Sequence, residues 1–299
     1  MNVSQLFNDL LFEINDGWQP MNDKPEETPE NTLRALWCLA CGDPKAVEYC
    51  CDCDLPTLSP KRMRRLRKLL QQRQAGIPLA HLTGRQCFME MEMLAGPEAL
   101  IPRKETELLG YAALEITKEL SQSRKSVTII DLCTGCGNLA LALACYNPTC
   151  RVYGADLSED AVLLARKNAE HLNPATPVEF RVGDLFAPFD EDTFWHQVDV
   201  IVCNPPYIST QHVDELPEEI GKHEPQLAFD GGPFGIGIIF RLIKETPRYL
   251  KPKSWLCFEV GVGQGKAVFR KIRQDEHYDE IRSVHDSQGQ IRALLARTV

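Results

Sequence analysis

Beyond residue 127, short apolar runs alternate with segments that carry apolar residues at helical spacing. The apolar runs predict strands at 127–132, 151–156, 178–184, 198–203, 254–260 and 281–286. Helices are predicted between them, over 139–145, 158–171 and about 235–250. Strands and helices that alternate in this way build a parallel sheet covered by helices, and such sheets bind ligands at the carboxyl ends of their strands. The sequence therefore predicts an α/β domain with its site at that edge.

The residues before this pattern have a different character. Apolar residues such as Leu33, Leu36 and Trp37 recur at helical spacing between about residues 5 and 80, and predict a small helical domain. Between about 87 and 102, apolar and polar residues alternate ahead of Ala95-Gly96-Pro97, which predicts a β-hairpin connector. We therefore expect a helical domain at 1–84, a hairpin connector at 85–105 and the α/β domain at 106–299.

Net charge limits the functions open to this chain. Its 299 residues carry a formal net charge of −9, which disfavours an extended nucleic-acid surface because phosphates are bound by basic faces. One basic run at 61–68 is an exception, but its spacing places Leu66, Leu69 and Leu70 on one face and predicts a solvated helix. The first residues lack a basic n-region, and no apolar run approaches the roughly 20 residues that span a bilayer. We expect a cytoplasmic protein with no membrane partner.

The 12 cysteines are expected to be reduced thiols, because the cytosol keeps them so. Cys38 and Cys41, together with Cys50 and Cys53, have the pair spacing of a zinc site. However, the gap between the pairs is short and the first pair lies in an apolar helical segment. A cluster of buried thiols without metal is the favoured interpretation, and zinc is the alternative.

A glycine turn follows the first predicted strand, in the segment DLCTGCGNLA at 131–140. Its glycines let the backbone approach a ligand, and the spacing G-x-G-x-x-A fits a dinucleotide as well as S-adenosylmethionine. Asp156, at the end of the second strand, suits a ribose in either case. Asp131 favours S-adenosylmethionine, because a carboxylate attracts the cationic amino-acid tail of that cofactor and repels a pyrophosphate.

A further acid, Asp184, lies in the segment GDLF at 183–186, after the third strand. It can accept a hydrogen bond from an adenine amino group while apolar neighbours cover the ring. The structural alternative for each of these acids is a helix N-cap or a turn, although Ser158 is the better cap for the helix after Asp156.

The tetrapeptide Asn204-Pro205-Pro206-Tyr207 follows the fourth predicted strand, at the same sheet edge. Its prolines fix the backbone and donate no N–H, so the loop is stiff and its carbonyl groups are free. The Asn204 amide oxygen and the Pro205 carbonyl can accept both hydrogens of a planar –NH2 group, while Tyr207 covers the substrate. Such a nitrogen is a poor nucleophile, so orientation and charge stabilisation matter more than a strong base. The alternative is a rigid turn that only ends the strand.

Several segments, in their order along the chain, resemble the class I S-adenosylmethionine-dependent methyltransferases of the release-factor glutamine N5-methyltransferase family. They are GIPLAHLTG at 76–84, LIPRKETELL at 100–109, the glycine turn, GDLF at 183–186, NPPYI at 204–208 and Glu224-Pro225 followed by Gly231-Gly232. The resemblance covers roughly residues 76–297. The segment IPRKETE at 101–107 is more specific to the glutamine family than the tetrapeptide, which base-methylating enzymes share.

The resemblance implies a Rossmann-like seven-stranded sheet with a small helical N-terminal domain that selects a protein partner. It implies S-adenosylmethionine as the cofactor, bound by Arg103, Thr106, Asp131, Thr134, Gly135, Gly137, Asp156, Leu157, Asp184, Leu185 and Asn204. It also implies that Asn204, Pro205, Pro206 and Tyr207 form the catalytic loop, with Glu259 at the floor of the site.

Three functions remain open on these residues. The first is methylation of a glutamine amide in a release factor or a ribosomal protein. The second is methylation of an exocyclic amino group of RNA or DNA, which the acidic net charge disfavours. The third is a nicotinamide oxidoreductase or a non-catalytic nucleotide-binding protein, and neither explains the tetrapeptide. The chain departs from the family pattern at Cys87, Cys133 and Phe229, which bears on the substrate more than on the chemistry.

Overall fold

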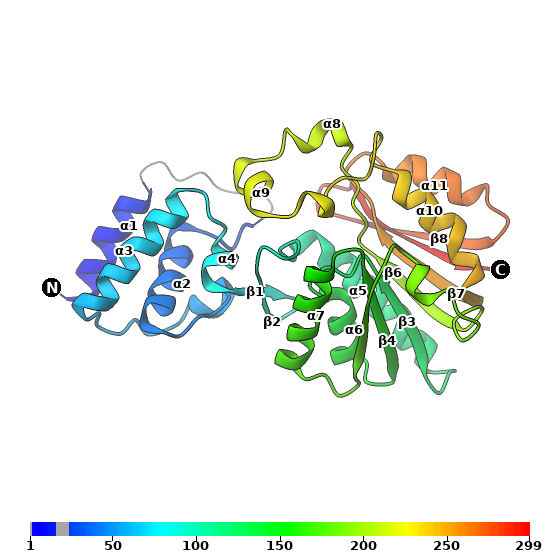
Figure 1. The fold of residues 1–299 in the computed structure, drawn as a ribbon, viewed down its shortest axis with the longest axis horizontal. Coiled ribbons are helices and arrows are strands. Elements are labelled where there is room, and N and C mark those ends of the chain that lie inside the picture. Colours follow the sequence, from blue (N-terminus) through cyan, green and yellow to red (C-terminus); the bar gives the residue numbers. More distant parts are fainter. Residues whose placement is uncertain (1, 16–23) are drawn as a thin grey trace.

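Helices form the N-terminal region of the computed structural model, which describes residues 2–15 and 24–299 (Figure 1). They are α1 (Val3–Asn15), α2 (Pro29–Cys41), α3 (Pro60–Gln74) and α4 (Leu79–Thr83), with the short helical turn η1 (Val47–Cys50) after α2. Thr28 caps α2 by accepting a hydrogen bond from the Asn31 N–H at 3.1 Å. The helices pack around a core of their own, in which Leu10, Trp37 and Leu66 are fully buried. The domain boundary at residue 84 stays a prediction.

A two-stranded antiparallel hairpin follows these helices, formed by β1 (Arg85–Phe88) and β2 (Met91–Leu94). Its turn lies at Met89 and Glu90, whose φ angles are 46° and 63°. Residues other than glycine rarely adopt this left-handed conformation. Here distant groups hold the turn, because the Met89 N–H donates to Glu107 Oε1 at 2.9 Å and the Tyr49 hydroxyl donates to the Glu90 carbonyl at 2.7 Å.

The main sheet has the strand order β5-β4-β3-β6-β7-β9-β8 among the described residues. Its strands are β3 (Val127–Leu132), β4 (Cys150–Asp156), β5 (Val178–Val182), β6 (Val198–Cys203), β7 (Leu250–Glu259), β8 (Tyr278–His285) and β9 (Ile291–Thr298). Neighbours from β5 to β7 are parallel, but β9 is antiparallel to both β7 and β8. The predicted parallel arrangement therefore holds from β5 to β7, and the sheet is mixed because β9 is antiparallel to its neighbours. Only residues 286–290 join β8 to β9, and a connection this short cannot make the crossover that parallel strands need.

Helices cover both faces of this sheet (Figure 1). One face carries α5 (Lys104–Ser121), α6 (Asn138–Tyr146) and α7 (Glu159–Leu172), and the other carries α10 (Gly237–Glu245) and α11 (Gly265–Arg273). Strand residues alternate between the two apolar layers. In β6, Val200 and Val202 pack in the first layer, and Ile201 and Cys203 pack in the second. Burial of both faces explains why these strands are almost continuously apolar in sequence.

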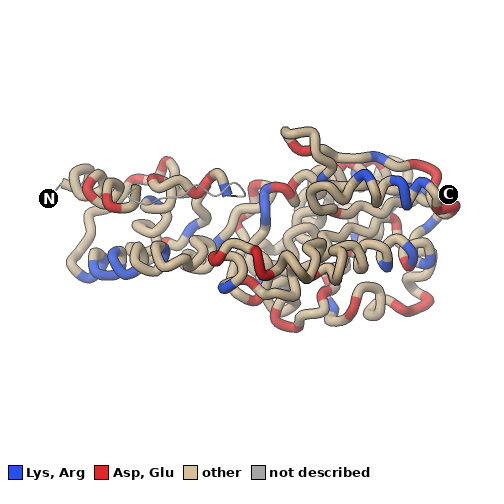
Figure 2. Tube along the Cα trace, turned by 90° about the horizontal axis from the view of Figure 1, so that it is seen from above, with Lys and Arg blue, Asp and Glu red and all other residues tan. Residues whose placement is uncertain are grey.

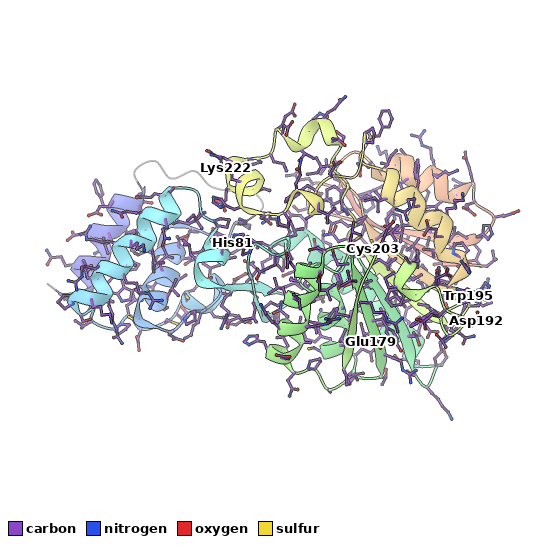
Figure 3. The ribbon with its side chains drawn as sticks, in the orientation of Figure 1. His81, Glu179, Asp192, Trp195, Cys203 and Lys222 are labelled. Atoms are coloured by element: carbon purple, nitrogen blue, oxygen red, sulfur yellow. The ribbon has the colours of Figure 1, made fainter. Side chains whose placement is uncertain are left out.

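Short elements follow β6 at the carboxyl edge of the sheet: α8 (Thr210–Val213), α9 (Glu218–His223) and η3 (Gln226–Ala228). Two other short turns are η2 (Ala187–Phe189) and η4 (Thr246–Arg248). Figure 3 labels Lys222 on α9 and His81 on α4, where the helical region meets the α/β region. Lys24 Nζ and Arg73 Nη1 each contact the Glu219 carboxylate, at 2.8 and 2.7 Å. These largely buried ion pairs tie α9 to the N-terminal helices.

Charged residues are interspersed over most of the molecule, with a basic run in the N-terminal region (Figure 2). This run is in α3, where Leu66, Leu69 and Leu70 are buried and most basic residues of 61–68 are exposed, as predicted. Within residues 2–15 and 24–299, no helix combines the length and the apolar character needed to cross a membrane.

Candidate active site

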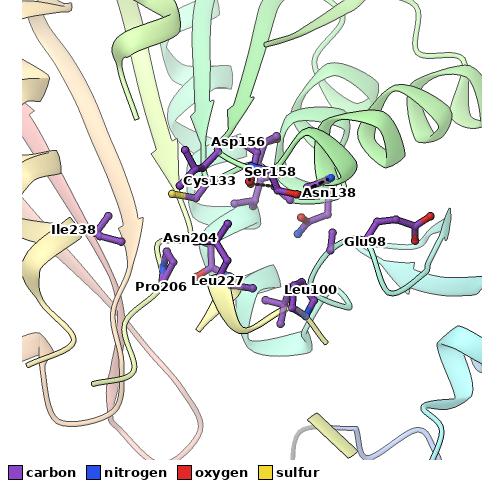
Figure 4. A pocket seen from close by; sticks show the side chains of 18 of the residues that line it. Glu98, Leu100, Cys133, Asn138, Asp156, Ser158, Asn204, Pro206, Leu227 and Ile238 are labelled. Carbon is purple, nitrogen blue, oxygen red and sulfur yellow. Dashed lines mark hydrogen bonds between the residues drawn. The ribbon is translucent and has the colours of Figure 1, made fainter. Parts of the chain in front are cut away.

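A cavity of about 150 Å³ lies at the carboxyl ends of β3, β4 and β6, the edge at which the sequence predicts a site (Figure 4). The glycine turn after β3 forms one wall. Gly135 and Gly137 have φ angles of 55° and 85°, a conformation that glycine adopts without strain. A Cβ atom at Gly137 would lie 3.0 Å from the Phe180 ring, whereas nothing lies within 4 Å of that position at Gly135. The turn therefore packs against the sheet at Gly137 and is open at Gly135.

Most residues predicted to surround a cofactor line this first cavity. They are Arg103, Thr106, Thr134, Gly135, Asp156, Leu157, Asp184, Leu185 and Asn204. Pro206 of the tetrapeptide lines it as well. Asp131 and Gly137 are not among the lining residues, because Asp131 is fully buried and Gly137 packs against Phe180.

Asp131 is fully buried at the end of β3 and holds the glycine turn. Its Oδ2 accepts hydrogen bonds from the Thr134 hydroxyl at 2.5 Å and from the Ala140 N–H at 3.1 Å. Its Oδ1 has no hydrogen-bond partner among the described residues. Burial raises the pKa of this carboxyl to about 7, since the charged form loses its hydration. A cation beside Oδ1 would favour the ionised form and lower the pKa again.

Asp156, at the end of β4, connects the turns that follow β3 and β4. Its Oδ2 accepts a hydrogen bond from the Gly135 N–H at 2.8 Å, and its Oδ1 accepts one from the Ser158 N–H at 2.9 Å. Burial raises the pKa of Asp156, and these backbone donors oppose that shift. The Ser158 hydroxyl accepts from the Ala161 N–H at 3.2 Å. Ser158 is therefore the cap of α7, as predicted, and Asp156 faces the cavity.

Asp184 lines the first cavity but is already paired. Arg241 of α10 donates from Nη1 and Nη2 to its two carboxylate oxygens, at 3.2 and 3.0 Å. The two residues are 57 positions apart, and no local pattern indicates the pair. The hydrogen bond predicted from an adenine amino group must therefore use the remaining lone pairs of this carboxylate.

A second cavity, of about 190 Å³, lies on the other side of the tetrapeptide. Pro205 and Tyr207 line it, and Ile220 and Phe229 contribute to its apolar wall. The residues that line both cavities are Leu100, Arg103, Asn204 and Ala228. Asn204 therefore lies at the boundary between the two, directly after Cys203 at the end of β6 (Figures 3 and 4).

Hydrogen bonds connect Asn204 to the buried carboxylate of Glu259, at the end of β7. Asn204 Nδ2 donates to Thr106 Oγ1 at 3.2 Å, and the Thr106 hydroxyl donates to Glu259 Oε2 at 2.8 Å. The Tyr207 hydroxyl donates to the other oxygen, Oε1, at 2.9 Å. Burial raises the pKa of both Glu259 and Tyr207. The raised pKa of Tyr207 keeps its phenol protonated. One carboxylate thus contacts the tetrapeptide directly at Tyr207 and, through Thr106, at Asn204.

Glu224, between α9 and η3, fixes the segment before α5. Its fully buried carboxylate accepts hydrogen bonds from the Ile101 N–H at 2.9 Å and from Arg103 Nη2 at 2.5 Å. Because Arg103 lines both cavities, this pair fixes part of their common wall. The sequence indicates Glu224 only through the family resemblance, since nothing local distinguishes it from the other acids of 214–224.

Other residues line the first cavity although no role in the site was predicted for them individually. They include Glu98, Leu100, Asn138, Leu227 and Ile238, which Figure 4 labels, and also Pro102. Gln264 is a further unpredicted residue, because its Nε2 donates to the Tyr207 carbonyl at 2.8 Å and so holds the end of the tetrapeptide. These residues come from separate segments that only the fold brings together.

The cysteines of the N-terminal region do not form a metal site in the part of the chain that the structure describes. Cys38 and Cys41 lie in α2, and Cys50 ends η1. Among residues 2–15 and 24–299, no three His, Cys, Asp or Glu side chains are arranged to hold a metal ion. The zinc alternative has no support there.

Comparison with known proteins decides between the three open functions. A family model described as a methyltransferase domain matches residues 123–295. The release factor glutamine methyltransferase of Moorella thermoacetica is 37% identical over 239 residues, which cover 80% of this chain and 81% of that protein. The chain belongs to the release factor glutamine methyltransferase family. The corresponding protein of Thermodesulfovibrio yellowstonii is 34% identical over 240 residues, covering 80% and 83%. The predicted membership is confirmed.

A solved structure supports the predicted fold of this methyltransferase. The hMettl16 catalytic domain, solved in complex with a 3′UTR hairpin, has a TM-score of 0.52 at 15% identity, covering 81% of this chain and 83% of that one. At this identity the similarity shows the fold alone. The seven-stranded class I methyltransferase sheet is confirmed.

S-adenosylmethionine is the cofactor of this methyltransferase, and the first cavity fits it. The unsatisfied Oδ1 of Asp131 lies behind the turn and suits a nearby cation such as the amine of the amino-acid tail. Gly135 leaves open space where a Cβ atom would stand. Leu157 is apolar and yet 54% exposed at the cavity, as expected of a side chain that covers a ring.

Proposed function

We propose that this methyltransferase transfers a methyl group to the side-chain amide nitrogen, N5, of a glutamine in a peptide chain release factor. The observation that carries the proposal is the position of Asn204 between two cavities, one that fits the cofactor and one that can receive a side chain. The relatives named above are release factor glutamine methyltransferases. A ribosomal protein presents the same chemical group and is the alternative acceptor.

Asn204 and Pro205 would hold the acceptor amide. The amide oxygen of Asn204 and the carbonyl oxygen of Pro205 can accept the two hydrogens of the acceptor –NH2 group, which fixes its plane. The bound cofactor supplies an electrophilic methyl group on a positively charged sulfur. With both N–H groups engaged on one side, a face of the nitrogen is directed toward the first cavity. The same two oxygens would stabilise the positive charge that develops on nitrogen as the methyl group moves from sulfur to nitrogen. The cofactor would leave as S-adenosylhomocysteine, whose sulfur is neutral, and the methylated nitrogen would release one of its two protons to solvent.

Pro206 and Tyr207 would complete the site. Pro206 lines the first cavity and Tyr207 the second, so the tetrapeptide separates cofactor from acceptor. The Tyr207 hydroxyl is held by Glu259, which fixes its ring beside the acceptor cavity. A ring in this position can cover the planar amide and exclude water.

The helical region at 1–84 would select the acceptor protein. Its Lys24 and Arg73 hold α9 through Glu219, and the next residue, Ile220, lines the acceptor cavity. A protein bound to the N-terminal helices would therefore contact a region that is joined, through Glu219, to the wall of the acceptor cavity. A cytoplasmic location, where release factors act, belongs to the same proposal.

Labelled methyl transfer tests the acceptor. The protein is incubated with methyl-labelled S-adenosylmethionine and a cell extract, and the products are treated separately with protease and with nuclease. We expect label that protease releases and nuclease does not. A purified release factor should then carry one methyl group on a glutamine, located by mass spectrometry. Label that nuclease removes and protease leaves would assign the activity to a nucleobase instead.

Asn204→Ala tests the catalytic loop. We expect turnover to fall by roughly 100-fold or more, as when a preorganised polar group is removed from a reacting centre. The affinity for S-adenosylhomocysteine, measured by calorimetry, should change little, since the cavity keeps its other lining residues. If cofactor affinity falls in parallel with turnover, Asn204 serves the cofactor and not the acceptor.

A further inference from the structure

The proposed function requires the Asn204 amide in one of its two orientations. Rotation by half a turn exchanges Oδ1 and Nδ2, which are similar in size, so packing alone does not choose between them. Oδ1 accepts a hydrogen bond from the acceptor amide, whereas Nδ2 in the same place would oppose one donor with another. A neighbouring group must therefore decide which atom faces the acceptor.

The direction of the hydrogen bonds around Glu259 makes that decision. An ionised carboxylate only accepts hydrogen bonds, and the Thr106 hydroxyl has a single proton. That proton goes to Glu259 Oε2, 2.8 Å away. Thr106 Oγ1 can then only accept, so the Asn204 atom that faces it, 3.2 Å away, must be the donor Nδ2. Oδ1 is consequently turned away from Thr106.

We propose that Thr106 is a positioning residue that transmits the hydrogen-bond polarity of Glu259 to Asn204 and so presents the Asn204 oxygen to the acceptor amide. Thr106 acts through Asn204 and has no contact of its own with the reacting nitrogen. This inference rests on the proposed function, because the oriented amide is the one that holds the glutamine.

The hydrogen bonds from Asn204 through Thr106 to Glu259 form a relay, and the surroundings of these residues keep it rigid. Thr106 is 1% exposed in the first turn of α5, and Glu259, at the end of β7, is 2% exposed and paired with Ala293 of β9. The family resemblance implies that Thr106 contacts the cofactor, and Thr106 does line the first cavity. Its hydroxyl, however, is engaged by Glu259 and Asn204. The resemblance implies only that Thr106 contacts the cofactor, whereas in the relay its hydroxyl orients the Asn204 amide.

The relay also implies a dependence on pH. The groups that face Glu259 are Thr106 and Tyr207, which donate hydrogen bonds, Arg292 at 3.9 Å and the negative charge of Glu105. If Glu259 takes up a proton, its own O–H can donate to Thr106, whose proton is then free to turn to Asn204. The amide flips in response and turnover falls. Burial raises the pKa of Glu259, so this loss should begin at a higher pH than for an exposed glutamate.

Three variants test the relay through turnover. Thr106→Val removes the hydroxyl at nearly constant shape, and Thr106→Ser keeps it. Thr117→Val is the matched control, because it removes another fully buried hydroxyl of α5 that bonds the Leu114 carbonyl. We expect kcat to fall roughly tenfold or more in Thr106→Val, equivalent to about 1.4 kcal/mol. Thr106→Ser should stay within about threefold of the wild type and lose turnover at the same acidic pH, and Thr117→Val should keep the wild-type kcat.

Cofactor affinity separates this role from a cofactor contact. In Thr106→Val the affinity for S-adenosylhomocysteine should stay within about twofold of the wild type while kcat falls. If affinity and kcat fall together, Thr106 binds the cofactor and the relay is wrong. Wild-type kcat in Thr106→Val also overturns it.

A spectroscopic measurement reads the orientation without an acceptor. In protein labelled with ¹⁵N at asparagine, the side-chain signal of Asn204 is assigned by its absence in Asn204→Ala. Its Nδ2 protons should exchange slowly in the wild type, in Thr106→Ser and in Thr117→Val, and rapidly in Thr106→Val. Equal exchange in all four proteins refutes the relay. If the wild type methylates no protein, the proposed function fails, and the exchange rates still decide whether Thr106 orients Asn204.

Discussion

Asp131→Asn should make the free protein more stable near neutral pH, although it changes a residue of the cofactor turn. The Asn side-chain oxygen can accept the hydrogen bonds that Thr134 and Ala140 now donate to Oδ2. The substitution removes only the negative charge, which the fully buried site disfavours. Asparagine therefore resembles the protonated form of Asp131.

The magnitude follows from the pKa of Asp131. Burial raises this pKa from 3.8 to about 7, so between these values the folded protein keeps a proton that the unfolded chain has lost. The contribution to stability is fully present below pH 3.8 and is lost as the pH rises through about 7. Over this interval of roughly three pH units, at about 1.4 kcal/mol per unit, the loss approaches about 4 kcal/mol. Above about pH 7 this loss of stability does not increase further.

Urea denaturation of the wild type and of Asp131→Asn between pH 5 and 8 measures this loss. Burial raises the pKa of Asp156 and Glu259 as well, but both proteins share these groups, so their difference isolates Asp131. We expect Asp131→Asn to gain about 3 kcal/mol relative to the wild type between pH 5 and 7, with no further gain above. Saturating S-adenosylhomocysteine, which carries a cationic amine, should reduce the difference. Parallel stability curves would refute a raised pKa at Asp131.

Two further substitutions test the packing around the site. Glu219→Gln removes the carboxylate that receives two largely buried cations and should lower the free energy of unfolding by about 3 kcal/mol in urea. Its matched control is Glu218→Gln, a surface position that is 74% exposed and should show no measurable change, so equal effects would contradict the buried network. Gly154→Ala places a Cβ atom 2.6 Å from the Phe180 ring under the glycine turn, which should cost about 1–3 kcal/mol and weaken S-adenosylhomocysteine binding. Wild-type stability and affinity in calorimetry would show that this contact relaxes freely.

The regular elements could be predicted because their signals are local. The strand predicted at 127–132 coincides with β3, and Ser158 caps α7 through a bond to a residue three positions away. The turn at Met89 and Glu90 could not be predicted in this way. Neither residue favours a positive φ, and the groups that stabilise the turn are 18 and 41 positions distant in sequence. The strands predicted from the sequence end at residue 286, so β9 was not among them. Its antiparallel direction follows from the short connection at 286–290, whereas the alternation of strands and helices before it indicates parallel pairing.

The same distinction between local signals and distant contacts applies to the candidate site. The sequence by itself determined the cofactor turn, the tetrapeptide after β6 and the family, because each is a continuous segment whose chemistry can be read residue by residue. Only the tertiary structure decided how these groups act together. Thr106 contacts Asn204 from 98 positions away and Glu259 from 153, and this contact gives the amide its orientation. The direction of a hydrogen bond depends on which buried donors and acceptors lie within bonding distance of one another. A sequence pattern does not specify which distant residues the fold brings to that distance.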